Sequence, residues 1–154
     1  VVFRTHSLLG HPWGDDFTYG ESTLMGGGIG GGTKALAMSG GMSGLMAAAN
    51  FGTSRRLLGK VLPKPGEGPS PASQERGYYD LRFHGVTVGG NEIMVKVTGD
   101  RDPGYGSTAK ILAEAATTLG DSSSKGGFWT PATVLGDSFI KALVKHAGLT
   151  FDVI

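Results

Sequence analysis

Alternation of apolar and polar positions is clearest in the middle of the chain. Residues 78–88 and 92–98 both place apolar side chains at every second position, which is the period of a strand with one buried face. Gly89, Gly90 and Asn91 lie between them and tolerate the positive φ angles of a tight turn. The pattern therefore predicts a β-hairpin. His84 occupies a polar position of its first strand and is expected to face solvent or a neighbouring strand.

The last third of the chain changes to helical periodicity. Residues 109–119 and 137–146 carry apolar side chains at the spacing of amphipathic helices, and Gly148 follows the second as a C-terminal cap. Shorter alternating runs predict strands at 17–25 and 149–154. Together with a helix end or strand at the start, this order predicts one α+β domain over residues 1–154. Its sheet is expected to be mainly antiparallel or mixed, with helices packed on one face.

A glycine run separates the first predicted strand from an uncharged segment. Six of the seven residues from Gly26 to Gly32 are glycine, and Gly26, Gly28 and Gly31 satisfy the G-x-G-x-x-G spacing of a dinucleotide-binding loop. No parallel β-α-β unit with an acidic residue at its second strand surrounds the run. A flexible strand-to-helix connection is therefore the preferred interpretation.

Residues 35–53 carry no charge, and their length is at the lower limit for a membrane span. Glycine, serine and asparagine make the segment only weakly apolar, so we expect a helix packed closely on the sheet or on a partner subunit. Arg55, Arg56 and Lys60 continue it as a basic, apolar helix, which leaves attachment to a lipid surface open. Four prolines within residues 63–71 then predict an extended linker or an ordered surface loop.

Composition mainly excludes function classes. The chain has 14 basic and 13 acidic residues with no basic run interleaved with aromatic residues, so nothing indicates a nucleic-acid partner. It has no cysteine, which excludes disulfides and fits a cytoplasmic location. Its four histidines lack metal-ligand spacing, so no metal site is expected. The chain begins with valine and shows no signal peptide, and we interpret it as a piece of a longer protein.

Candidate chemistry concentrates in residues 99–110, between a predicted strand and a predicted helix. Arg101 suits bidentate recognition of a carboxylate or phosphate, and Tyr105 can give a hydrogen bond or a proton to a substrate oxygen. These two are the candidate catalytic residues. The candidate substrate-binding residues are Asp102, Ser107, Thr108, Lys110, Phe128 and Trp129. The alternative is that the acidic residues shape the turn, Ser107 caps the helix and the two aromatic residues belong to the core.

Several separate motifs, in the same order, resemble the C-terminal portion of the saccharopine dehydrogenase-like oxidoreductases, a family that includes trans-acting enoyl reductases. They are Arg55-Arg56-Leu57-Leu58, residues 63–70 (PKPGEGPS), residues 98–105 (TGDRDPGY) with Thr108, residues 126–131 (GGFWTP) and residues 146–153 (HAGLTFDV). The resemblance covers most of the chain and is strongest from Arg55 onward.

The resemblance implies that a nucleotide-binding Rossmann domain precedes this segment and holds NAD or NADP, so that no cofactor is expected here. This chain would be the substrate-binding or dimerisation half of a nicotinamide-dependent oxidoreductase, inactive alone, acting on a lipid- or polyketide-linked enoyl or carbonyl group. We expect a homodimer with possible contact to a lipid or membrane surface. The alternative is a non-catalytic assembly or lipid-surface module.

Overall fold

The computed structural model describes residues 1–64, 66–122 and 126–154. It divides the chain into two compact units, one made of Val1–Thr18 with Pro69–Ile154 and the other of Tyr19–Gly68. We call them the sheet unit and the helical unit and describe each by itself. The sequence predicts a loop at 63–71 and also one at 120–127, where Ser, Gly and Asp predominate, and each loop includes residues outside the described ranges.

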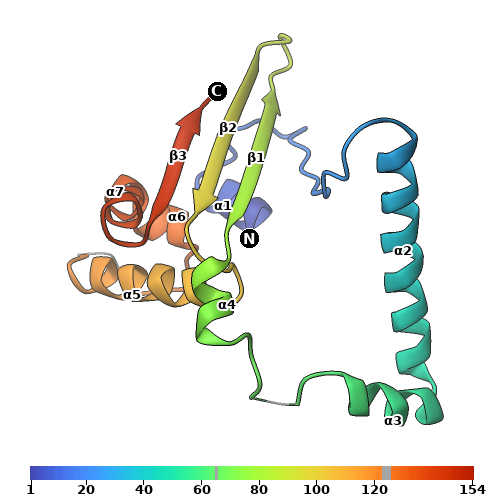
Figure 1. Ribbon diagram of the computed structural model, residues 1–154. Helices are drawn as coiled ribbons and strands as arrows, with labels where there is room; N and C mark the ends of the chain where they lie inside the picture. The colour runs from blue at the N-terminus through green and yellow to red at the C-terminus, as the bar shows by residue number, and fades with distance from the viewer. Residues whose placement is uncertain (65, 123–125) are drawn as a thin grey trace. The chain divides into compact units, whose positions relative to one another are not determined.

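The sheet unit combines one antiparallel sheet with helices, and this confirms the predicted α+β class (Figure 1). Its strands lie in the order β1-β2-β3. The predicted hairpin, the two longer helices and the final strand are all confirmed. The elements are α1 (Val2–Leu8), α4 (Pro71–Arg76), β1 (Tyr79–Val86), β2 (Glu92–Gly99), α5 (Gly106–Gly120), α6 (Pro131–Val134), α7 (Gly136–His146) and β3 (Leu149–Val153).

The strand predicted at residues 17–25 is wrong, since that segment has no regular structure. Phe17 packs instead on Trp13, with ring centroids 5.0 Å apart, and the Tyr19 hydroxyl donates to Glu21 Oε1 at 2.8 Å. Alternation of apolar and polar residues shows only that an extended segment would have one apolar and one polar face. A strand also needs a neighbour for its backbone hydrogen bonds, and this segment has none among the described residues.

Two short helices were not anticipated from the sequence, and both begin at a proline. Ser70 caps α4 by accepting a hydrogen bond from the Ser73 N–H at 3.2 Å, and Thr130 caps α6 in a capping box with Thr133. Proline is well suited to a first helical position because its missing N–H would have no helical partner there. The prolines that argued against helix thus start helices at both places.

The sheet has one apolar and one polar face because residues paired across antiparallel strands point to the same side. The apolar rows run through Leu81, Val97 and Phe151, and through Phe83, Val95 and Val153. Helices α5 and α7 pack on one end of this face. The core there consists of Leu143, Ala147, Leu149, Ile111 and Phe139.

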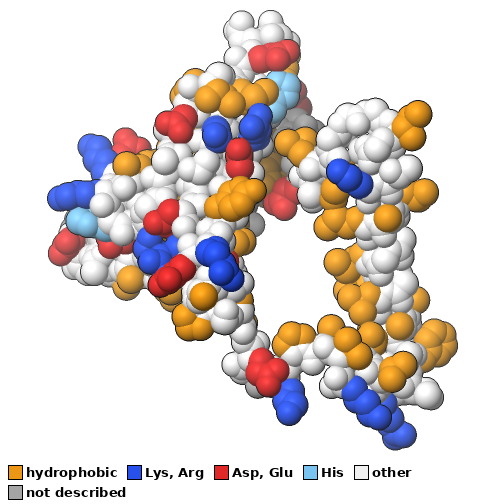
Figure 2. All heavy atoms as spheres, in the orientation of Figure 1, with side chains coloured by type: hydrophobic (Ala, Val, Ile, Leu, Met, Phe, Trp, Pro, Cys, Tyr) orange, Lys and Arg blue, Asp and Glu red, His pale blue; other side chains and the backbone are white. Residues whose placement is uncertain are grey.

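The polar face carries charges that are paired with one another. The Asp80 carboxylate forms ion pairs with Arg82 at 3.4 Å and with Lys96 at 3.7 Å. His84 Nε2 lies 3.1 Å from a carboxylate oxygen of Glu92. His84 therefore faces solvent beside the neighbouring strand, as predicted. Figure 2 shows blue and red side chains gathered over the strands on the side turned to the viewer.

Helix α1 is held in the sheet unit by polar and ring contacts. Thr5 and Thr130 share a hydrogen bond of 2.8 Å between their hydroxyls, and His6 Nε2 donates to the Gly14 carbonyl at 2.9 Å. The His6 ring also stacks on Trp13 with centroids 5.0 Å apart. This end of the chain is thereby joined to the segment that enters α6.

The helical unit consists of α2 (Gly28–Asn50) and α3 (Gly52–Val61), which contact each other. The helix predicted over 35–53 and its basic continuation are confirmed, although α2 begins earlier, so part of the glycine run forms its first turns. Most large apolar side chains of the unit are exposed, as the orange spheres along α2 show (Figure 2). Within the described residues, no helix is both long and apolar enough to cross a membrane.

Candidate functional site

The turn between β2 and α5, residues 100–108, is organised around Asp102, and we call it the Asp102 turn. The Asp102 carboxylate accepts hydrogen bonds from the backbone N–H groups of Tyr105 at 2.9 Å and Gly106 at 2.8 Å. The backbone carbonyl of Asp102 accepts a hydrogen bond from the Ser107 N–H at 2.9 Å, and the backbone N–H of Asp102 donates one to the Gln74 carbonyl at 3.0 Å. One residue thus satisfies the first N–H groups of α5 and ties the turn to α4.

The charge state of Asp102 follows from the same contacts. Partial burial acts to raise the pKa of its carboxyl, whereas hydrogen bonds from the backbone N–H groups of Gly106, Tyr105 and Gly104 act to lower it. The hydrogen bonds together prevail because they stabilise the charged form. The pKa of Asp102 therefore lies below its ordinary value, and the carboxylate is ionised at neutral pH.

We expect Asp102→Asn to lower the free energy of unfolding at pH 7, because an amide offers one acceptor oxygen where the carboxylate offers two. The folded pKa lies below the unfolded value of about 3.9, so the stabilisation by the charge is complete above that value and is lost as the pH falls through the folded pKa. The difference between wild type and variant should shrink on acidification. Urea unfolding at pH 7 and pH 3 measures it. A difference that does not change with pH would contradict this role of the charge, and Asp152→Asn on β3 controls for loss of one charge elsewhere.

Arg101 and Tyr105 flank Asp102 and remain accessible. Arg101 Nη1 lies 3.8 Å from Glu75 Oε1, and both side chains are partly exposed. An exposed pair at this distance contributes little, so an anionic ligand can take the place of Glu75. Tyr105 is 55% exposed, and its hydroxyl makes no hydrogen bond within the described part of the chain. The structure thus places both candidate catalytic residues in one turn, which the hydrogen bonds of Asp102 organise.

The other polar candidates of this stretch have partners inside the fold. Ser107 is buried, and its hydroxyl lies 2.9 Å from the Tyr79 hydroxyl. The Thr108 hydroxyl donates to the Pro103 carbonyl. Lys110 Nζ donates to both carboxylate oxygens of Asp100 at 3.0 Å and to the Ala147 carbonyl at 3.1 Å. These residues hold β2, α5 and the end of α7 together.

Phe128 and Trp129 lie in the segment that enters α6. The Phe128 carbonyl accepts a hydrogen bond from Arg4 Nη2 at 3.4 Å, and the residue after Trp129, Thr130, is bonded to Thr5 of α1. Phe128 is 84% exposed and Trp129 is 45% exposed. These hydrogen bonds place the pair in the contact region of α1 and α6.

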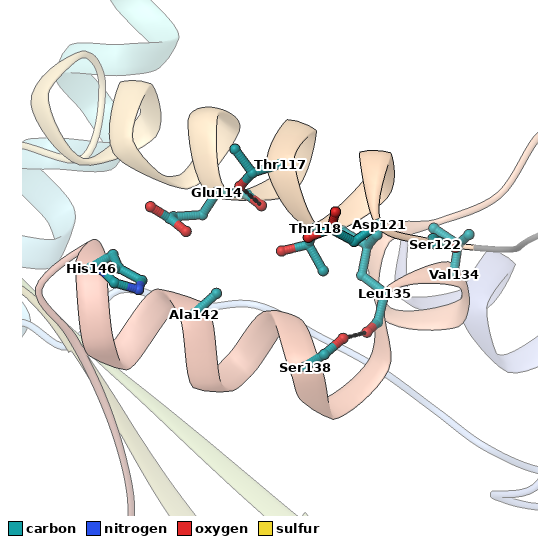
Figure 3. Close-up of a pocket in the computed structure, with 10 residues that line it drawn as sticks. All are labelled: Glu114, Thr117, Thr118, Asp121, Ser122, Val134, Leu135, Ser138, Ala142 and His146. Atoms are coloured by element: carbon teal, nitrogen blue, oxygen red, sulfur yellow. Dashed lines mark hydrogen bonds between the residues drawn. The ribbon is translucent and has the colours of Figure 1, made fainter.

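A groove of about 540 Å³ runs between α5 and α7, and Figure 3 shows its lining. Glu114 and His146 lie toward one end, and Ser138 donates to the Leu135 carbonyl toward the other. Sequence reasoning missed this groove. The sequence feature that could have indicated it is a row of polar residues at helical spacing on α5, Glu114, Thr117 and Thr118. This row faces small and polar residues on α7. The lining residues are Glu114, Thr117, Thr118, Asp121, Ser122, Val134, Leu135, Ser138, Ala142 and His146.

Two sequence features raised the question of metal or nucleotide binding, the histidines and the glycine run. No group of three or more His, Cys, Asp or Glu residues there is placed to hold a metal ion. The glycine run does not form a strand-to-helix phosphate loop, since a segment without regular structure precedes it and Gly28 already begins α2.

Comparison with known proteins finds similarity to enoyl reductases. A Mycobacterium tuberculosis protein named provisionally as a trans-acting enoyl reductase is 32% identical over 155 residues, with 93% of this chain and 36% of the relative covered. The trans-acting enoyl reductases of Mycobacterium ulcerans and Mycobacterium bovis are each 31% identical over 150 residues, with the same coverage.

The chain therefore spans about a third of the length of these curated relatives. No protein-family model matches it, and no solved structure matches it significantly. The comparisons thus relate this chain to one part of longer proteins named for enoyl reduction.

Proposed function

We propose that this chain is the substrate-side domain of a nicotinamide-dependent, saccharopine dehydrogenase-like enoyl reductase whose NAD or NADP is bound by another part of the longer protein. The observation that carries the proposal is the similarity of 93% of the chain to part of proteins named trans-acting enoyl reductases. The accessible pair of Arg101 and Tyr105 on the Asp102 turn supports it.

The roles of these two residues follow from the chemistry of enoyl reduction. The nicotinamide would supply a hydride to the β-carbon of the enoyl group. The electrons of the carbon–carbon double bond then move toward the carbonyl oxygen, and a hydroxyl donor such as Tyr105 stabilises that oxygen as its charge develops. A proton from solvent adds to the α-carbon and completes the reduction. Arg101 binds an anionic group of the substrate, such as a carboxylate or phosphate, through its planar guanidinium. The hydrogen bonds of Asp102 hold both residues in place.

The test uses the full-length protein with a short enoyl thioester and NADPH or NADH, followed by loss of nicotinamide absorbance. We expect Tyr105→Phe to lower kcat by about 100-fold or more and Arg101→Ala mainly to raise KM. Arg82→Ala, on the polar face of the sheet, is the matched control and should retain activity. The 154-residue chain alone should show no saturable binding of NADPH or NADH. Full activity in both site variants, or saturable micromolar binding by this chain, would contradict the assignment.

A second candidate function, a lipid-surface or assembly module, is favoured by the helical unit. This unit holds five basic and two acidic residues, and Arg55, Arg56 and Lys60 share α3 with the exposed Leu57 and Val61. Basic helices with exposed apolar side chains bind anionic lipid surfaces. Binding to anionic vesicles that weakens with salt and requires Arg55 and Arg56 would favour this candidate over a purely catalytic role.

A further inference from the structure

The groove between α5 and α7 shares no lining residue with the Asp102 turn and has no role in the proposed reaction. Its volume of about 540 Å³ lies in the range of pockets that bind small molecules. Glu114 and Thr118 from α5 and Ala142 from α7 are directed into the space between the two helices (Figure 3). The helices thus form opposite walls of one site, and the chemistry of its lining decides which class of ligand fits.

The lining carries two carboxylates, those of Glu114 and Asp121. They are two helical turns apart, which corresponds to about 10 Å along the axis of α5. Neither forms an ion pair with another residue in the described part of the chain. Lys110, one turn before Glu114, is engaged with Asp100 and the Ala147 carbonyl instead. The groove therefore has two uncompensated negative charges at a defined separation.

Two hydroxyls of the lining use their hydrogen atoms within the helices. The Thr117 hydroxyl donates to the Glu114 carbonyl at 3.0 Å, and the Ser138 hydroxyl donates to the Leu135 carbonyl at 2.6 Å. A hydroxyl whose hydrogen is engaged presents only the lone pairs of its oxygen to a ligand. Among the described lining residues, His146 alone can carry a positive charge. The lining is thus rich in acceptors and favours a ligand rich in donors, such as an ammonium group, which has three N–H donors and no acceptor.

Apolar side chains complete the lining. Val134, Leu135 and Ala142 belong to it, and Leu135 is only 7% exposed. These side chains can cover a hydrocarbon chain and remove its surface from water. A divalent metal ion is a poorer match, because the described ranges hold no group of three or more His, Cys, Asp or Glu residues placed to bind one. The combined lining therefore suits an organic cation with an aliphatic body.

We propose that the groove binds a linear aliphatic ligand with an ammonium group at each end, one at Glu114 and the other at Asp121. The separation of the two carboxylates sets the length of the ligand, and the apolar residues contact its methylene groups. Binding is moderate in strength, because Glu114 is only partly buried and Asp121 is exposed, and ion pairs in contact with solvent contribute little each. This site does not rest on the proposed function.

The test titrates 1,8-diaminooctane into the 154-residue chain in a calorimeter at low ionic strength. We expect saturable one-to-one binding with a Kd of about 1 mM or lower. The control ligand is 1,4-diaminobutane, which carries the same charge but is too short to reach both carboxylates, and it should bind roughly fivefold more weakly. Equal binding of the two diamines, or no saturable binding of the longer one, would overturn the proposal.

Variants locate the binding in the groove. Glu114→Gln and Asp121→Asn should each weaken binding of 1,8-diaminooctane about fivefold, because each removes one ion pair. Asp152→Asn on β3 is the matched control, since it removes one negative charge outside the lining and should leave the Kd unchanged. Equal weakening in all three variants would show a general attraction between opposite charges and overturn the site.

A second measurement does not depend on the charges. Ala142→Leu keeps the charge of the groove and fills part of it, so it should also weaken binding, with unfolding curves of the variant to check that the fold is retained. Backbone amide shifts in NMR spectra should change on α5 and α7 around Thr118 and Ala142 as the diamine is added. Shift changes confined to other elements, or unchanged binding in Ala142→Leu, would contradict the assignment.

Discussion

Replacing Gly148 with alanine is expected to lower the free energy of unfolding by about 3 kcal/mol or more. Gly148 has a φ of +74°, and a Cβ added there would overlap the carboxylate of Asp100. That carboxylate binds Lys110 Nζ, which also donates to the Ala147 carbonyl. The substitution thus combines a left-handed backbone position with displacement of the contact that joins β2, α5 and α7. Urea or thermal unfolding of the chain measures the loss.

Gly136 provides the matched control for this prediction. It has a φ of +54°, but an added Cβ would meet nothing within 4 Å, so Gly136→Ala should cost only the left-handed conformation, about 1 kcal/mol. In a double-mutant cycle, Asp100→Ala should reduce the additional effect of Gly148→Ala, because it removes the atoms that clash. Equal losses in Gly136→Ala and Gly148→Ala would show that the contact with Asp100 contributes nothing.

Gly77→Ala is expected to cost about 2–3 kcal/mol and to displace the Asp102 turn from α4. A Cβ at Gly77 would overlap the backbone N and Cα of Asp102, so the backbone itself has to move. The hydrogen bond from the Asp102 N–H to the Gln74 carbonyl would then be strained or lost. Unfolding of this chain measures the stability, and hydrogen exchange at the Asp102 amide reports the local change.

The control for Gly77 lies within the turn itself. At Gly104 an added Cβ would meet Asp102 Oδ2 at 3.4 Å, an ordinary contact, so Gly104→Ala should change stability little. If the proposed function holds, Gly77→Ala should also lower turnover in the full-length protein although it removes no side chain that meets substrate. Unchanged exchange at the Asp102 amide would contradict a close approach of α4 to the turn.

Local patterns predicted the regular elements where the chain supplies both a period and its end signals. The hairpin was recognisable because alternation on both sides of Gly89 and Gly90 requires no information from elsewhere in the chain. The same holds for α7, whose periodicity ends at Gly148 in the left-handed position expected of a C-terminal cap. The segment 17–25 shows the limit, since its alternation lacks a partner strand among the described residues.

The candidate site was likewise predictable from the sequence only in part. Sequence reasoning located the turn before α5 and named Arg101 and Tyr105, because charged and hydroxyl residues gather there. It could not tell them from Ser107 and Lys110, whose partners Tyr79 and Ala147 lie 28 and 37 positions away. The groove between α5 and α7 was missed for the same reason, since each helix contributes only part of its lining.

By itself, the sequence determined the α+β class, the hairpin, the longer helices and the turn that carries the candidate chemistry. These features depend on side-chain periods and turn residues within a few positions of one another. Only the tertiary structure decided which polar side chains are engaged internally and which end of the apolar sheet face is uncovered. Both depend on where distant segments such as α7 come to pack, because burial and hydrogen bonding are properties of contacts between elements and no single element contains them.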